Sequence, residues 1–144
     1  MSRTAFASIV GAFVTAFQAA PAVSANVFRA MPREIAEQHA EAVNVQFDAA
    51  EPNAGAISGA PVDWRSRVSV DLYAKSSAVS GDLAVDPLLK AAYERVMQDT
   101  TLGGLVDYIG VPYIAAEYDG KGQKTGWIRM VFPVEHRTSN LTLE

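Results

Sequence analysis

The chain has 144 residues and a mass of 15.4 kDa, which is the size of one domain covering residues 1–144. Apolar residues make up 49% and charged residues 19%, a balance that excludes an intrinsically disordered chain. The lack of cysteine excludes disulfides, thiolate catalysis, zinc–thiolate sites and iron–sulfur clusters. A net charge of −4 is not the basic excess of proteins that grip nucleic acid by its phosphates.

The first apolar segment, Phe6 to Phe17, predicts an amphipathic helix. Its large apolar side chains fall on one helical stripe, and small polar residues recur on the opposite stripe. Pro21 ends this helix, because proline biases its predecessor away from the α region. The alternative is a secretory signal, since Arg3 precedes the apolar stretch and Val23-Ser24-Ala25 resembles a cleavage site.

Alternating residues predict a first hairpin. The strand at Val43–Phe47 has one apolar face, and Asn44, Gln46 and Asp48 are expected on its solvent face. Glu51–Asp63, rich in Pro, Gly and Ala, predicts a long loop. The strand at Trp64–Tyr73 follows. Its two faces are predicted to carry Trp64, Ser66, Val68, Val70 and Leu72 on one side and Arg65, Arg67, Ser69 and Asp71 on the other.

The second half of the chain repeats this order. Asp86-Pro87 predicts the start of a helix that runs to about Asp99, and the glycines of Thr101–Val106 predict a tight reversal after it. Strands are predicted at Tyr108–Tyr118 and Gly126–Arg137, with Pro112 indicating an edge position and Asp119–Gly122 forming the turn between them.

The element order α-β-β-α-β-β predicts an α+β fold. Two helices are expected to pack on one face of a mainly antiparallel, about four-stranded sheet, with the long loop in the first hairpin. Neither a GxGxxG motif nor a βαβ alternation indicates a nucleotide-binding fold.

No group of residues indicates catalysis. Glu34, Glu37 and Glu41 stand at helical spacing near His39, but without a second histidine nearby they are better explained as a solvated acidic face. No serine has the surroundings of a nucleophile elbow, and Gly120-Lys121-Gly122 indicates a hairpin turn rather than a phosphate loop. We therefore expect a protein that is not an enzyme, with no catalytic, cofactor-binding or metal site and no cofactor.

Several residues are candidates for an interface. Trp64 and Trp127 fit core packing or an interface, and His136 fits a hydrogen-bonding residue at the surface or in an interface. Residues 33–63 carry one basic and six acidic side chains, whereas residues 64–75 carry three basic and one acidic. This imbalance predicts either complementary faces between copies of the chain or pairing within the first hairpin.

Two stretches, Thr101-Leu102-Gly103-Gly104-Leu105 and His136-Arg137-Thr138, are the most telling part of a pattern that covers nearly the whole chain. Other parts of it are Asn26–Arg29, Ile35–His39, Gly59–Trp64, Asp86 with Leu88-Leu89, and Gln123–Trp127. In this pattern the chain resembles the tail terminator proteins of long-tailed bacteriophages, the family of the lambda minor tail protein U.

The resemblance implies a structural virion protein with an α+β fold. Such proteins form a hexameric ring on the tail tube, stop its polymerisation and present the surface that joins the filled head. The implied partners are copies of the chain itself, the major tail tube protein and the head–tail connector or neck protein. Genomic DNA passes through the lumen without sequence-specific binding, and no membrane is involved. The implied location is the head-proximal end of the virion tail, after assembly in the host cytoplasm.

Subunit or partner contacts are expected at exposed arginines, because arginine favours bidentate pairing with carboxylates. The candidate residues are Arg65, Arg67 and Arg137, with Trp64, Trp127 and His136 beside them. One alternative is a neck or head-completion adaptor of the same virion. Another, of a different class, is a secreted small ligand-binding or enzymatic domain whose residues 1–25 are a signal peptide.

Overall fold

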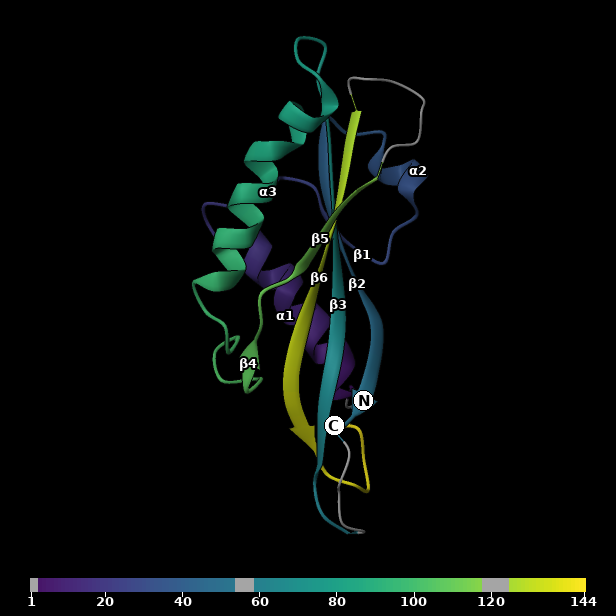
Figure 1. The fold of residues 1–144 in the computed structure, drawn as a ribbon, viewed down its shortest axis with the longest axis vertical. Helices are drawn as coiled ribbons and strands as arrows, with labels where there is room; N and C mark the ends of the chain where they lie inside the picture. Colours follow the sequence, from purple (N-terminus) through teal and green to yellow (C-terminus); the bar gives the residue numbers. More distant parts are fainter. Residues whose placement is uncertain (1–2, 54–58, 118–124) are drawn as a thin grey trace.

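The computed structural model describes residues 3–53, 59–117 and 125–144. The elements in chain order are α1 (Ala5–Gln18), β1 (Val27–Arg29), α2 (Arg33–Ala36), β2 (Glu41–Pro52), β3 (Val62–Lys75), α3 (Gly81–Met97), β4 (Tyr108–Ile109), β5 (Tyr113–Glu117) and β6 (Thr125–Thr138). The long strands run along the longest axis of the molecule (Figure 1). The centre of the predicted Glu51–Asp63 loop and the predicted Asp119–Gly122 turn lie outside the described residues.

The strands form one mixed sheet in the order β1-β2-β3-β6-β4, with β5 also paired to β6. β3 and β6 pair antiparallel along their whole length, from Val62 opposite Thr138 to Lys75 opposite Thr125. Only β1 runs parallel to its neighbour, β2, among the strands of the described residues. The prediction of a mainly antiparallel sheet is confirmed. The predicted number of about four strands is wrong, because the sheet has six.

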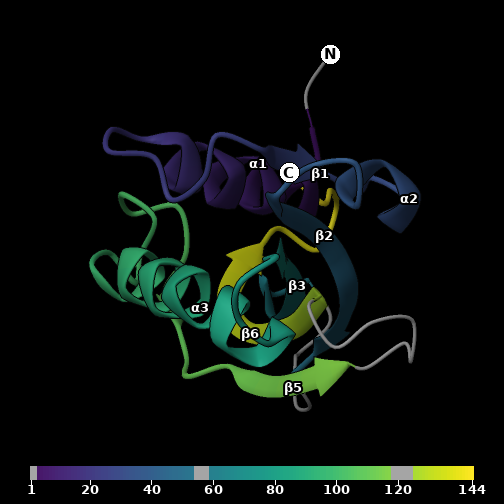
Figure 2. The same ribbon diagram turned by 90° about the horizontal axis from the view of Figure 1, so that it is seen from above.

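α1 and α3 lie against the same face of the sheet (Figure 2) and share one apolar core with it. Phe13 and Phe17 of α1 are fully buried, and the Phe13 ring lies 5.6 Å from that of Phe132 on β6. Thr4 caps α1, because its Oγ1 accepts a hydrogen bond from the Ala7 N–H at 3.2 Å. The amphipathic first helix is therefore confirmed, and its apolar stripe fills the space over the sheet.

The second long helix begins five residues earlier than the predicted Asp86-Pro87 start. Gly81 opens α3 at a close contact with the beginning of β6, where a Cβ on Gly81 would lie 2.0 Å from the Thr125 carbonyl oxygen. Gly126 makes the reciprocal contact, since its Cβ would lie 2.2 Å from the Gly81 oxygen. Two glycines therefore allow the helix to start against the strand. Pro87 lies exposed inside the helix.

Val43–Phe47 is a strand as predicted, but it does not have one buried and one solvated face. Asn44 is buried under the segment that follows β1, and its side-chain amide pairs with both backbone groups of Met31 at 3.0 Å. Phe47, expected in the core, is 44% exposed. β1 was not predicted, because three residues are too few to carry a periodic signal.

The predicted Tyr108–Tyr118 strand is divided into β4 and β5 on either side of Gly110, Val111 and Pro112. Both short strands pair with β6 and form the edge of the sheet, so the edge position indicated by Pro112 is confirmed. No helix among the described residues combines the length and hydrophobicity needed to cross a membrane.

Phe13 tests how strongly α1 holds the fold. Phe13→Ala should lower the free energy of unfolding by about 3–5 kcal/mol, because it leaves a cavity between α1 and β6. Urea unfolding monitored by circular dichroism measures this change. Thr15→Ala, on the exposed side of the same helix, is the control and should change stability by less than about 0.5 kcal/mol. Equal losses in the two variants would show that α1 is not anchored through its apolar stripe.

Candidate functional site

The arginines predicted at interfaces line the sheet face that points away from α1 and α3. Each of them has a carboxylate partner on a neighbouring strand of the same chain. The pairs are Arg65 with Glu135 at 2.8 Å, Arg67 with Glu51 at 3.4 Å and Arg137 with Asp63 at 2.7 Å. Pairing across strands thus accounts for part of the uneven charge, and contacts of these arginines with a second molecule remain a prediction.

These ion pairs are largely exposed, so each adds little to the free energy of folding. Two of them do shift the pKa of a paired group. The hydrogen bond from Arg137 holds the pKa of Asp63 below its usual value, and the bond from Arg65 to Glu135 raises the pKa of the Arg65 guanidinium. The face therefore presents ordered, alternating charges to solvent.

Further along the same face the charges become more buried. Arg129 binds Asp71 through two hydrogen bonds of 2.7 and 3.1 Å, and Asp71 is 4% exposed. Glu117 accepts a hydrogen bond from Arg33, whose guanidinium lies 4.4 Å from the ring centre of Trp127. Trp127, a candidate interface residue, is itself 4% exposed. It therefore anchors α2 to the sheet within the chain.

Trp64 and His136 lie opposite each other on β3 and β6, on the helix side of the sheet. The Trp64 indole N–H donates to the Thr138 hydroxyl at 2.9 Å, and both rings meet Phe6 edge to face. His136 is 2% exposed, so within the chain it lies in the interior, and its role in an interface stays a prediction.

The structure brings Ser66 Oγ within 2.6 Å of His136 Nε2, although the two residues are 70 positions apart. The spacing of these residues in the sequence does not indicate such a pair. The arrangement differs from a hydrolytic triad in two ways. Both side chains are almost fully buried, and no described residue is a hydrogen-bond partner of His136 Nδ1 that could orient the ring. A substrate carbonyl cannot reach this serine in the described conformation.

His39 and the glutamates around it do not form a metal site in the structure. Among the described residues no three His, Cys, Asp or Glu side chains are grouped so that they could hold an ion. The His39 ring instead lies 5.4 Å from the ring of Phe28.

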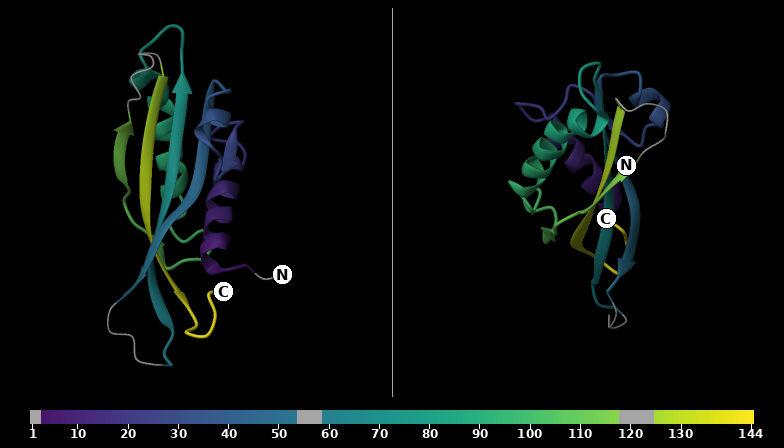
Figure 3. Two further views of the ribbon diagram at one scale, coloured as in Figure 1. Left: turned by 90° about the vertical axis from the view of Figure 1, so that its right-hand side faces the viewer. Right: turned by 45° about the horizontal axis from the view of Figure 1, so that its top comes forward.

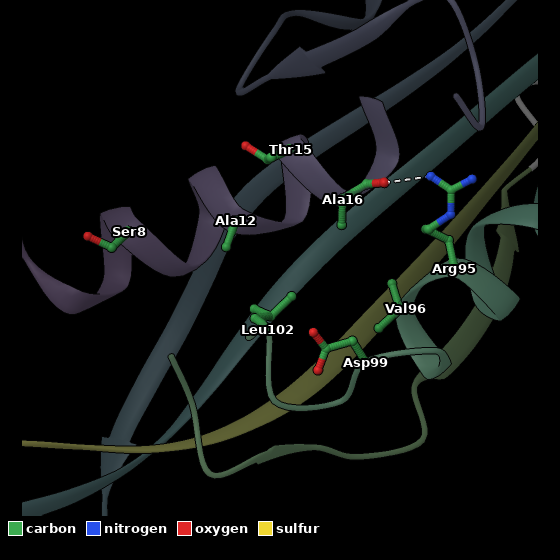
Figure 4. A pocket seen from close by; sticks show the side chains of 8 residues that line it. All are labelled: Ser8, Ala12, Thr15, Ala16, Arg95, Val96, Asp99 and Leu102. Carbon is green, nitrogen blue, oxygen red and sulfur yellow. Dashed lines mark hydrogen bonds between the residues drawn. The ribbon is translucent and has the colours of Figure 1, made fainter. Parts of the chain in front are cut away.

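A groove of about 460 Å³ separates α1 from α3 and the turn after it. It is lined by Ser8, Ala12, Thr15, Ala16, Arg95, Val96, Asp99 and Leu102 (Figure 4). Its two charged groups are already bound. Arg95 donates to the Ala16 and Ala19 carbonyls at 2.7 and 2.9 Å, and Asp99 accepts from the Thr101 hydroxyl and the Gly103 N–H. The groove therefore offers small apolar walls without a free charge to orient a ligand.

The sheet edge holds the exposed residues that sequence reasoning missed. Five of the ten large apolar side chains that are exposed among the described residues lie between positions 105 and 114. They are Leu105, Tyr108, Val111, Tyr113 and Ile114. Because they come from an edge strand and its flanks, they make an apolar border along β4 and β5, which we call the β5 edge. The edge signal of Pro112 was available in the sequence, but the outward direction of these side chains was not.

Comparison of the chain with protein-family models gives no match, and comparison with curated proteins gives none either.

Arg95 should act as a clamp between the two long helices. Its guanidinium also donates to the Pro21 carbonyl at 2.5 Å, so three carbonyls at and after the end of α1 depend on one side chain. Arg95→Ala should therefore lower the free energy of unfolding by about 2–3 kcal/mol. Arg95→Lys should recover little of this loss, since an ammonium group cannot reproduce the fork.

Urea titration measures these changes, and Lys90→Ala, an exposed position of the same helix, is the matched control. A stability of Arg95→Ala equal to that of the control would disprove the clamp.

His136 should make the fold sensitive to mild acid. Burial lowers the pKa of His136, with Asp107 and Glu135 partly opposing the shift, so the folded protein holds the ring neutral. The unfolded chain binds a proton at this residue below about pH 6.5. Stability should therefore be unaffected by this group above about pH 7 and fall as the pH decreases below about 6.5, by up to about 1.4 kcal/mol per pH unit.

Unfolding curves between pH 7.5 and 5 test this dependence. His136→Gln should flatten it, whereas His39→Gln, at the other histidine, should retain it. The same slope in all three proteins would assign the acid sensitivity to other groups.

Proposed function

We propose that this chain is a structural virion protein that forms a ring on the end of a phage tail tube, stops tail polymerisation and provides the surface for head joining. The observation that carries the proposal is the resemblance of the Thr101–Leu105 and His136–Thr138 stretches to tail terminators. The first stretch folds as the turn after α3, with positive φ at Gly103 and Gly104, and it leads directly into the β5 edge.

Two features of the described residues support a role in assembly. The Ser66–His136 pair is enclosed, and the groove between α1 and α3 has no unpaired charge, so neither favours catalysis. The β5 edge is an exposed apolar border, and surfaces of this kind commonly mark contacts between proteins. Arg65, Arg67 and Arg137 are the residues that we assign to contacts with neighbouring subunits or with the tube and connector proteins.

The mechanism would need no bond to be made or broken. One face of the ring fits the last ring of the tail tube, and the other face cannot accept a further tube subunit, so growth stops. The head-proximal end of the virion tail is the proposed location. Genomic DNA crosses the lumen, and the chain's net negative charge disfavours its retention there.

Deleting the gene from the phage that encodes it tests the proposal. Negative-stain microscopy of the lysate should show overlong or unjoined tails beside normal filled heads, and a plasmid copy of the gene should restore infectious particles. Tails of normal length that fail to join heads would instead favour a neck adaptor. Normal tails firmly attached to heads would refute both virion roles.

A further inference from the structure

A closed ring needs two different surfaces on each subunit that fit one another, whereas a two-fold dimer uses one surface twice. We propose, building on the ring function above, that the β5 edge of one copy packs into a hollow on the opposite side of the next copy. The occupant of that hollow is thus a second copy of this chain, in a head-to-tail contact.

The β5 edge has the character of a contact surface. Tyr113 and Val111 are 71% and 73% exposed, and β5 pairs with β6 on one side only among the described strands. No described strand pairs with the backbone groups on its other side, and exposed edge strands tend to be covered in native assemblies. A neighbour that covers this edge would remove both large apolar side chains from water.

The opposite side of the molecule carries a hollow of about 360 Å³, which we call the α1–β2 hollow. It is lined by Ala7, Val10, Arg29, Ala30, Gln46 and Phe47. β1 pairs with β2 only at Val43–Val45, so no described strand pairs with β2 on this side from Gln46 onward, although the Phe6 ring of α1 lies 5.3 Å from that of Phe47. Half of the lining residues are small, and the partly exposed Phe47 ring adds an apolar surface for an incoming side chain.

The two surfaces lie on opposite borders of the sheet, with β5 at one side and β2 with α1 at the other (left view of Figure 3). The two surfaces also lie at the same position along the strand direction. Tyr113 is paired with Val131, Val131 with Ser69, and Ser69 with Gln46, so Tyr113 and Gln46 end the same cross-strand row. Neighbouring copies can therefore meet at these surfaces without a shift along the strand direction, as closure of a ring about an axis parallel to the strands requires.

Charge on the two sides is complementary. Asp107, at the start of the β5 edge, is exposed and has no ion pair among the described residues. Arg29 lines the α1–β2 hollow, and its guanidinium donates to the neutral Ala7 carbonyl at 2.9 Å without a carboxylate partner in the described part of the chain. Asp107 lies in the cross-strand row of Glu135 and Arg29 in that of Met130, so the two charges do not pair directly when the copies meet without a shift. An acid on one surface and a base on the other still favour a contact between unlike surfaces over a contact between like ones.

Size and shape also favour a head-to-tail contact. The β5 edge carries large exposed side chains, whereas the α1–β2 hollow is recessed and three of its six lining residues are small. A two-fold contact would set these large side chains against each other and leave the hollow unused. The contact between unlike surfaces fills the hollow and covers the exposed edge together.

The absence of cysteine from the chain makes a direct test possible. Tyr113→Cys and Gln46→Cys proteins are purified separately and oxidised alone or as a mixture. The mixture should give a disulfide-linked dimer, and neither protein alone should give one. Efficient linkage of Tyr113→Cys to itself would demonstrate a two-fold contact between β5 edges and overturn the proposal.

Sedimentation velocity of the purified protein gives the second measurement. Wild-type protein should form a closed oligomer as its concentration rises, and Tyr113→Asp should weaken this association on the order of 30-fold or more. Leu83→Asp, at an exposed apolar residue on α3, is the control and should assemble as the wild type does. Thermal unfolding shows whether the variants keep the fold.

Two results would overturn the contact: assembly of Tyr113→Asp with wild-type affinity, or wild-type protein that stays monomeric at its highest soluble concentration and gives no mixed disulfide. The latter result would assign the β5 edge to a different virion protein. The proposed function is refuted by a different result. If the crosslinking confirms this contact but deletion of the gene leaves the phage tails normal, the ring contact stands and only tail termination is refuted.

Discussion

The ladder between β3 and β6 is the constraint on which the rest of the molecule depends. The two strands are 14 residues long and pair along their whole length, and most of the other elements attach to them directly. β2 extends the sheet from β3, β4 and β5 extend it from β6, and α3 begins against the first residues of β6. Because side chains alternate along a strand, this one register decides which residues of both strands enter the core and which carry the outer charges.

Most of the elements that could be predicted from the sequence were predicted from its local periodicity. The apolar stripe of Phe6–Phe17 repeats with the helical period, so its buried face follows from the sequence alone. The alternation of Trp64–Tyr73 separates the two faces of β3, but Ser69 and Asp71 on the face away from the helices are buried as well. The same alternation placed Arg65 and Arg67 on the outer face. It could not supply their partners, since Glu135 lies 70 positions away from Arg65 and becomes its neighbour only through the β3–β6 register.

The features that escaped prediction depend on contacts between distant segments. Asn44 looks like a solvent-facing strand residue until the segment at Met31 crosses over it and satisfies its amide. Asp86-Pro87 has the local chemistry of a helix start, but the close contact of Gly81 with Gly126 sets the start earlier. The apolar residues of the β5 edge are similarly ambiguous, because an edge strand and a buried strand can use the same side chains.

In the proposed ring, the division between charged and apolar surfaces would explain how the copies stay separate before assembly. The outer-face arginines are already paired within the chain, and exposed ion pairs add little to affinity. The free energy of association would then come chiefly from the β5 edge, where each buried large apolar side chain contributes about 1.5–3 kcal/mol. Loss of translational and rotational freedom costs roughly 4–15 kcal/mol. The net free energy of a single contact between two copies is therefore close to zero. Closing a ring adds one more contact without a further association step, and this last contact makes assembly cooperative. A template that brings subunits together, such as the end of a tail tube, would therefore favour the ring strongly over free pairs.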